Sequence, residues 1–202
     1  MKKVFIFWDN SNIFISGKMV ASEIEGKNAY YQFRLQFDKI LELASAGREI
    51  EYAIAVGSVP PELRQVWNKM EQLGINVEKY ERGSDSNKEQ AVDQALQVSM
   101  LRKAFDYNGT PGIVVMLTGD GHGFLDGVGF HADLERMHVK GWEIEIIAWE
   151  KTCNSRLKIW AQDVGTFIRL EDYYESVTFL DDENGVIRNS KPLSLDNRIK
   201  ST

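Results

Sequence analysis

The chain has 202 residues, a length that fits one domain with a full hydrophobic core, or one domain followed by a tail. Hydrophobic residues make up 43% and charged residues 27%, as in ordinary globular proteins. The net charge of -6 argues against a strongly basic protein that binds nucleic acid without specificity. It does not exclude an enzyme whose carboxylates meet phosphate through a bound cation.

Two features bear on where the protein works. Cys153 is the single cysteine, which excludes an internal disulfide and a cysteine-rich zinc module. The first apolar run, residues 4–8, ends at Asp9 after five residues. That run is too short for the core of a signal peptide or for a membrane span. We therefore expect a cytoplasmic protein that does not enter a membrane.

Strand-like and helix-like segments alternate along the chain. The predicted strands cover residues 3–8, 50–58, 75–81, 112–120, 142–149 and 166–172. The predicted helices cover residues 29–45, 61–73, 88–105, 124–139 and 155–162, with Pro61 as a first helical residue and Gly74 as a C-cap. Such alternation with apolar strands predicts an α/β fold with a mainly parallel sheet covered by helices on both faces. From about residue 181 the chain turns polar, which predicts a poorly ordered tail or an arm that docks elsewhere.

Acidic residues mark the ends of two predicted strands. Asp9 follows the first strand, and Asp120 follows the fourth within LTGDGHGF. Asp93 lies on the preceding helix beside its apolar stripe, where a carboxylate is costly unless it is paired or binds a cation. Parallel sheets bind ligands beyond the carboxyl ends of their strands, and carboxylates suit Mg²⁺ or Mn²⁺. Asp9, Asp93 and Asp120 would therefore bind such an ion if they converge at one end of the sheet. The alternative that the sequence leaves open is a strand-exit turn in which the aspartate caps the helix that follows.

The residues next to these aspartates have two roles that the sequence leaves open. Asn10, Ser11 and Asn12 are expected to form a loop held by hydrogen bonds from side chain to backbone. Alternatively, they orient Asp9 or contact a phosphate. Gly119 and Gly121 flank Asp120 and allow a tight turn with close approach of the backbone to a ligand.

Three motifs occur in an informative order: FIFWDNSNIF, KEQAVDQALQVSM and VVMLTGDGHGF. Together they resemble the NYN domain, in the LabA-like branch of the PIN-like nuclease superfamily. The resemblance spans residues 3–170 and implies a three-layer α/β/α sandwich, Rossmann-like, around a mainly parallel sheet. We accordingly expect a PIN-like domain over residues 1–170 and a C-terminal extension, partly a polar tail, over 171–202.

The resemblance also implies an activity, namely metal-dependent hydrolysis of phosphodiester bonds in RNA. It assigns Asp9, Asp93 and Asp120 as catalytic residues that bind Mg²⁺ or Mn²⁺. The chain departs from the family pattern at Ser99, where many members have a second aspartate on the helix, and at Gly121-His122-Gly123-Phe124. A fourth carboxylate is thus missing from its usual place. His122 and Asp126 are the candidates for an additional ligand, and one metal ion fits the remaining carboxylates better than two.

Candidate contacts to an RNA substrate surround these positions. Asn10, Ser11, Asn12 and Lys88 are the predicted substrate-binding residues. Lys18 is a second candidate for phosphate, like Lys88. Trp8 and the pair Tyr30 and Tyr31 are candidates for stacking on unpaired bases.

Two other readings of the sequence compete with the nuclease. The first is a catalytically weak or inactive PIN-like module that binds RNA or a protein partner, as the missing carboxylate allows. The second is a phosphatase or nucleotide hydrolase with an aspartate nucleophile, but that chemistry needs Asp-x-Asp where this chain has Asn10 and Ser11 after Asp9. Phosphate-binding and dinucleotide-binding glycine motifs are absent from the sequence. Residues 170–182 mix aromatic and acidic side chains and are expected to contact a second copy in a homo-oligomer or to cover a sheet edge.

Overall fold

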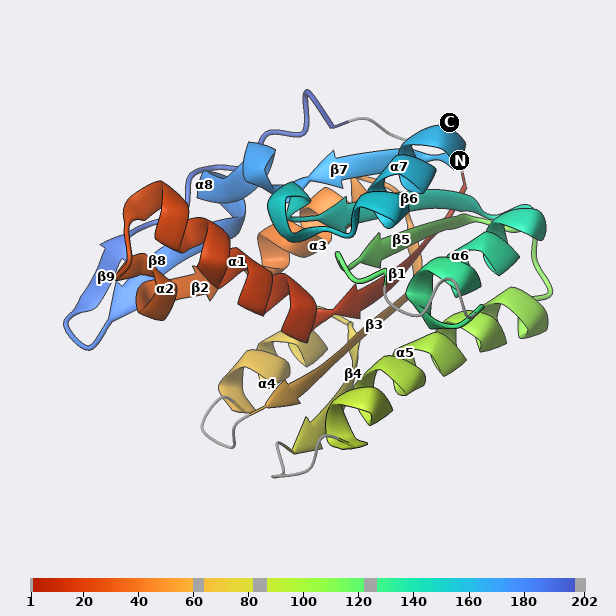
Figure 1. Cartoon of the computed structure of the whole chain (residues 1–202), viewed down its shortest axis with the longest axis horizontal. Coiled ribbons are helices and arrows are strands. Elements are labelled where there is room, and N and C mark those ends of the chain that lie inside the picture. Colours follow the sequence, from red (N-terminus) through yellow and green to blue (C-terminus); the bar gives the residue numbers. More distant parts are fainter. Residues whose placement is uncertain (1, 60–63, 82–86, 122–126, 199–202) are drawn as a thin grey trace.

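A computed structural model describes residues 2–59, 64–81, 87–121 and 127–198 (Figure 1). The side chains of residues 58–59, 64–66, 79–81 and 87–93 lie outside this description. The centre is a six-stranded sheet of order β4-β3-β1-β5-β6-β7, in which all neighbours pair in parallel. Its strands are β1 (Val4–Asp9), β3 (Ile50–Val59), β4 (Asn76–Glu81), β5 (Ile113–Leu117), β6 (Glu143–Ala148) and β7 (Thr166–Arg169).

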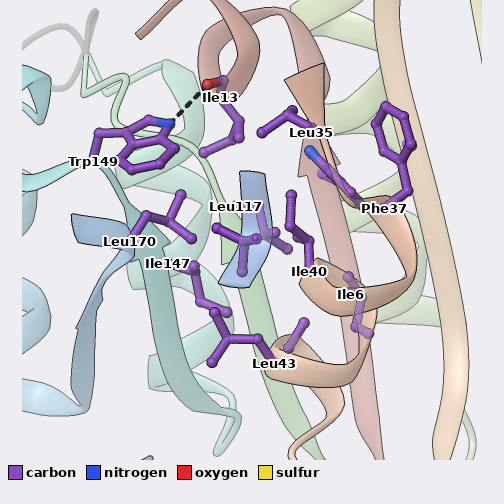
Figure 2. Packing of buried hydrophobic residues seen from close by; sticks show 14 of the residues in the cluster. Ile6, Ile13, Leu35, Phe37, Ile40, Leu43, Leu117, Ile147, Trp149 and Leu170 are labelled. Atoms are coloured by element: carbon purple, nitrogen blue, oxygen red, sulfur yellow. Dashed lines mark hydrogen bonds between the residues drawn. The ribbon is translucent and has the colours of Figure 1, made fainter. Parts of the chain in front are cut away.

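Helices cover both faces of this sheet. They are α1 (Asn10–Glu25), α3 (Phe37–Ser45), α4 (Arg64–Gln72), α5 (Asn87–Asp106), α6 (Gly129–Val139) and α7 (Ser155–Val164). Side chains alternate along a strand, so Ile6 and Trp8 of β1 pack with residues of α1, α3 and α4, while Phe5 and Phe7 pack with residues of α5, α6 and α7. Figure 2 shows part of the first cluster, in which the indole Nε1 of Trp149 donates to the carbonyl of Ile13 at 2.8 Å. The predicted α/β/α sandwich with a parallel sheet is confirmed.

Trp8 lies within this core. Its side chain is fully buried, and its ring centroid lies 5.7 Å from that of Phe37. The prediction that Trp8 stacks on RNA bases is therefore wrong. The side chain points to the face of the sheet that α3 covers, because it alternates with Phe7 along the strand.

The single helix predicted over residues 29–45 is also wrong. The segment forms α2 (Ala29–Gln32), β2 (Phe33–Leu35) and then α3. β2 belongs to a second, antiparallel sheet of order β2-β8-β9, with β8 (Thr178–Asp182) and β9 (Gly185–Arg188). Phe33 and Leu35 are both buried and Arg34 between them is not, which is the alternation of a strand with one covered face. Gly17 of α1 lies against this strand, since a Cβ there would come 2.4 Å from Cζ of Phe33.

The C-terminal segment packs onto the body of the protein. Residues 170–177 form a 3-10 turn, η4 (Leu170–Tyr173), and the short helix α8 (Tyr174–Val177), and four of the side chains from 170–180 join the first core cluster. The predicted strand at 166–172 thus ends at Arg169. Beyond β9 the chain continues as an arm rather than a disordered tail as far as residue 198, because Leu193 and Leu195 pack against the core. The domain boundary at residue 170 and the homo-oligomer stay predictions. Among the described residues, no helix is both long enough and apolar enough to span a membrane.

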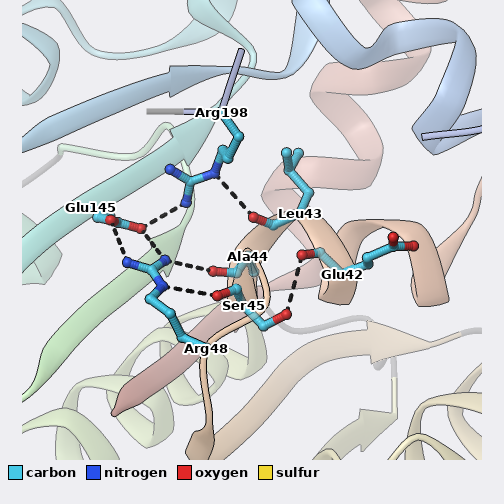
Figure 3. A network of polar contacts seen from close by, with 7 residues as sticks. All are labelled: Glu42, Leu43, Ala44, Ser45, Arg48, Glu145 and Arg198. Atoms are coloured by element: carbon cyan, nitrogen blue, oxygen red, sulfur yellow. Dashed lines mark hydrogen bonds and ion pairs between the residues drawn. The ribbon is translucent and has the colours of Figure 1, made fainter. Parts of the chain in front are cut away.

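A buried ionic network holds the end of this arm (Figure 3). Glu145 of β6 is fully buried and accepts from both terminal nitrogens of Arg48, each at 2.8 Å, and from Nη2 of Arg198 at 2.7 Å. Arg48 also donates to the carbonyls of Ala44 and Ser45, and Nε of Arg198 donates to the carbonyl of Leu43 at 3.1 Å. Charges removed from water need such dense pairing. The network therefore ties the sheet, the end of α3 and the C-terminal arm together.

We expect Glu145→Ala to lower the free energy of unfolding by about 3–5 kcal/mol, because it leaves two guanidinium groups buried without their counter-ion. Urea unfolding followed by circular dichroism measures this loss. Lys191→Ala is the matched control in the same arm, since the Lys191–Glu175 pair is exposed to solvent. It should cost less than about 1 kcal/mol. Equal losses in the two variants would contradict the role given to the network.

Candidate functional site

Asp9 ends β1 and begins α1. Its Oδ1 accepts a hydrogen bond from the backbone N–H of Asn12 at 3.0 Å, so Asp9 is the N-cap of the helix. The helix starts at Asn10, and the loop predicted for Asn10, Ser11 and Asn12 is therefore wrong. The physical reason is that a carboxylate placed three residues before a free N–H satisfies one of the donors that every helix leaves open at its start.

Thr118 connects Asp9 with Asp120. Its buried hydroxyl donates to Oδ2 of Asp9 at 3.1 Å and accepts from the backbone N–H of Asp120 at 3.1 Å. Asn12 adds a second bridge, since its Oδ1 accepts from the N–H of Gly119 at 2.8 Å. The structure thus links the Asp9 carboxylate to the backbone of Asp120 at the ends of the neighbouring strands β1 and β5.

Asp9 is buried, with only 4% of the residue exposed. A buried carboxylate is costly unless donors surround it. Three features offset this cost. The Asn12 N–H and the Thr118 hydroxyl each donate to the carboxylate, and the positive end of the α1 dipole lies beside it. The same contacts hold both carboxylate oxygens in fixed positions.

The glycines around Asp120 allow close packing within the protein. A Cβ on Gly119 would lie 3.1 Å from Cα of Cys153, and one on Gly121 would lie 2.7 Å from Cγ of Asn154. Asn154 N–H donates to the carbonyl of Gly119 at 2.8 Å, and its side-chain oxygen caps α7. The close approach predicted for a ligand is thus made here by the segment after β6. Thr118 and Asn154 were missed as parts of this site, although an asparagine ahead of a helix is a recognisable capping signal.

Cys153 lies beside this turn but is no candidate nucleophile. Burial raises the pKa of its thiol to about 12. The thiolate, which is the reactive form, is therefore scarce at neutral pH.

The remaining predicted residues are only partly described. Asp93 and Lys88 belong to the first half of α5, but their side chains lie outside the description. Figure 1 shows the first turns of α5 on the side toward which the strands run. His122 and Asp126 lie outside the described residues altogether. Lys18 lies on α1 with its Nζ 4.2 Å from the ring centroid of Tyr30.

The donors at this edge suit a hard cation. Among the side chains that the structure describes, no three His, Cys, Asp or Glu residues form a group that could hold a metal ion. Asp9 and Asp120 are two of the three predicted ligands. The third, Asp93, lies in the part of α5 whose side chains are outside the description. The side-chain oxygen of Asn10, next to Asp9, is buried and has no hydrogen-bond partner in the described part of the chain. Carboxylate and amide oxygens are the ligands that Mg²⁺ and Mn²⁺ favour, so these residues fit such an ion.

Comparison with known proteins bears on the fold and the family. A solved structure of a protein of unknown function from Vibrio parahaemolyticus RIMD 2210633 is similar, with a TM-score of 0.59 and 16% sequence identity. The similarity covers 92% of this chain and 96% of that one, and at this identity it shows a shared fold. No curated protein matches this chain.

The family model described as NYN domain matches residues 3–164, which include β1, Asp9, α5 and Asp120. This range covers most of the chain and contains the three motifs on which the resemblance rested. The chain therefore belongs to the NYN domain family, which suggests a member of the PIN-like nuclease superfamily.

Proposed function

We propose that this protein is a metal-dependent ribonuclease that hydrolyses phosphodiester bonds in RNA. The observation that carries the proposal is the Asp9–Thr118–Asp120 arrangement at the carboxyl edge of the sheet, in a chain of the NYN family. Ligands of parallel α/β sheets bind at this edge. The family is nuclease-like, and a buried carboxylate is held by hydrogen bonds at the carboxyl edge of the sheet. Together these two facts favour hydrolysis over a purely structural role.

In the proposed site Asp9, Asp93 and Asp120 hold Mg²⁺ or Mn²⁺. Such an ion lowers the pKa of a bound water and polarises a phosphate oxygen. One oxygen of Asp9 accepts from the Asn12 N–H and the other accepts from the Thr118 hydroxyl. These two hydrogen bonds orient the carboxylate before any substrate binds. The carboxylates also attract the cation that a negatively charged protein needs in order to approach phosphate.

The residues around the three aspartates have proposed roles as well. The side-chain oxygen of Asn12 accepts a hydrogen bond from the Gly119 N–H. The main proposed role of Asn12 is therefore to fix the turn that contains Asp120. Asn10, Ser11 and Lys88 are proposed to contact the substrate. His122 or Asp126 is proposed as the additional ligand that replaces the missing carboxylate.

Asp9→Asn should abolish cleavage and preserve the fold. Asparagine is an N-cap as good as aspartate, so α1 keeps its first turn while the charge on the proposed metal ligand is lost. Incubation of pure protein with labelled single-stranded RNA and Mn²⁺ measures the rate, and circular dichroism checks the fold. We expect a loss larger than the roughly 10- to 100-fold typical of residues that only support a metal ligand.

Asp163→Asn is the matched control for Asp9→Asn, because Asp163 is exposed on α7. It should cleave as the wild type does. Full activity of pure Asp9→Asn protein would sink the proposal. RNA that is bound but never cut, with any metal, would instead favour the binding module.

Metal binding can be measured without any substrate. Millimolar Mg²⁺ or Mn²⁺ should raise the Tm of the wild-type protein, because a ligand that binds only the folded state stabilises it, by about 2.7 kcal/mol at a concentration 100 times Kd. EDTA should reverse the shift and stop cleavage. Asp9→Asn and Asp120→Asn should show a much smaller shift. An equal shift in all three proteins would place the ion somewhere else.

Thr118→Val should weaken the metal site without removing a proposed ligand. The change keeps the shape of the side chain but leaves Oδ2 of Asp9 and the N–H of Asp120 without their shared hydroxyl. We expect metal affinity to fall by about 10- to 100-fold, as for other groups that orient a metal ligand. Titration of Mn²⁺ followed by Tm measures it, and Thr118→Ser, which keeps the hydroxyl, should restore most of the affinity.

A further inference from the structure

Tyr31 presents an aromatic ring to solvent at the far end of α1. Its side chain is 76% exposed, although large aromatic rings usually bury most of their surface. Tyr30 lies beside it, with ring centroids 5.2 Å apart and the planes 74° from parallel. Since Tyr30 meets its neighbour edge to face, the Tyr31 ring keeps substantial surface available for another flat group.

The backbone beneath Tyr31 is firmly held. Nη1 of Arg34 donates to the carbonyls of Tyr31 at 3.0 Å and Phe33 at 2.9 Å. Ala29, at the start of α2, is buried in the core, and so is Phe33 at its end. The backbone at this position therefore loses little conformational freedom when the ring binds a partner.

Positive charge accompanies the two tyrosines. Nζ of Lys18 lies 4.2 Å from the centroid of Tyr30 and 5.5 Å from that of Phe14. Lys27 is exposed two residues before α2 begins. The carboxylates at the end of α1 are engaged with cations, Glu23 with Lys151 and Glu25 with Arg188. The surface around the tyrosines can therefore meet an anion, even though the whole chain carries a charge of -6.

This surface is continuous with the candidate metal site along α1. Ser11, Ile15 and Lys18 follow one another at spacings of four and three residues, which places them on one side of the helix. Ile15 and its neighbour Met19 are exposed. Nine residues at ~1.5 Å each put Lys18 roughly 13 Å from Asp9, about the length of four stacked nucleotides. Figure 1 shows α1 leading from the ends of the strands to α2, which lies against its far end.

We infer that this stripe of α1 and the Tyr30–Tyr31 pair form a platform for single-stranded RNA. Tyr31 stacks on a base, and Lys18 and Lys27 contact the phosphates on either side of it. Unpaired bases are the part of RNA that offers flat faces for stacking, whereas paired bases hide them. The connection to Asp9 rests on the proposed nuclease function, but the stacking itself does not need cleavage.

Binding is best measured with cleavage switched off. A fluorescently labelled 12-nucleotide RNA is titrated with full-length Asp9→Asn protein, once with Mg²⁺ and once in EDTA, and anisotropy gives Kd. Adding Tyr31→Ala should weaken binding about 5- to 100-fold, which corresponds to the stacking of one base. Tyr31→Phe keeps the ring and should bind like its parent.

Phe105→Ala is the matched control. Phe105 is also an exposed ring, 63% exposed, and Nζ of Lys140 lies 4.3 Å from its centroid, but it belongs to α5. The control should leave Kd unchanged. A 2-aminopurine base in the RNA supplies a second signal, since its fluorescence falls on stacking and should not fall with Tyr31→Ala.

Substrate length and pairing add two further tests. A dinucleotide bound at Asp9 is too short to reach Tyr31, so Tyr31→Ala should not affect it. A fully paired duplex should likewise show no Tyr31 dependence. An unchanged Kd for Tyr31→Ala on the 12-nucleotide strand, or an equal loss for Phe105→Ala, overturns the inference. So does a complete lack of RNA binding both with Mg²⁺ and in EDTA.

The outcomes separate this inference from the proposed function. RNA that binds through Tyr31 but is never cut with any metal supports the platform and refutes the nuclease. Metal-dependent cleavage with a KM for long RNA that Tyr31→Ala leaves unchanged supports the nuclease and refutes the platform. When both hold, Tyr31→Ala raises KM for the long strand and changes kcat little.

Discussion

The burial of β1 on both faces and along both edges is the constraint on which the rest of the structure depends. Its side chains belong alternately to the two core clusters, and its backbone pairs with β3 on one side and β5 on the other. A strand held in this way can neither slide nor tilt without disturbing both cores. Asp9 therefore lies at a fixed position, where it ends the strand, caps α1 and accepts a hydrogen bond from the Thr118 hydroxyl. One residue thereby links the sheet, the first helix and the candidate site.

β1 and β5 could be predicted from the sequence because each is an uninterrupted hydrophobic run, the pattern of a strand covered on both faces. α1 could not, because small residues, Ser16, Gly17 and Ala21, make up most of its buried side and leave only Ile13 and Val20 as large apolar positions. The sequence did not predict β2 for a different reason. Its partner β8 lies far along the chain, and local sequence does not encode such a pairing. The burial of Arg198 likewise follows only from its contact with Glu145, since arginine is ordinarily a surface residue.

For the candidate site, position was more predictable than geometry. Asp9 and Asp120 follow from the general rule that ligands meet parallel sheets at the strand ends, and the structure places both there. The sequence does not reveal that one hydroxyl, that of Thr118, serves both residues, because this depends on a rotamer and on the alignment of two strands. Nor does it reveal that the space beside Gly121 belongs to Asn154, because that contact forms only once β6 has joined the sheet.

The central place of β1 has a consequence for how the protein is made. Val4 pairs with Ile50 on one side and with Ile113 on the other. A chain that leaves the ribosome with its N-terminus first therefore carries one edge of Val4–Trp8 without its partner strand until β5 has been synthesised. This stretch is apolar, uncharged and rich in residues that favour strands, the composition from which intermolecular β-structure grows. The segment that organises the finished molecule is thus open to pairing with other chains while the molecule is unfinished.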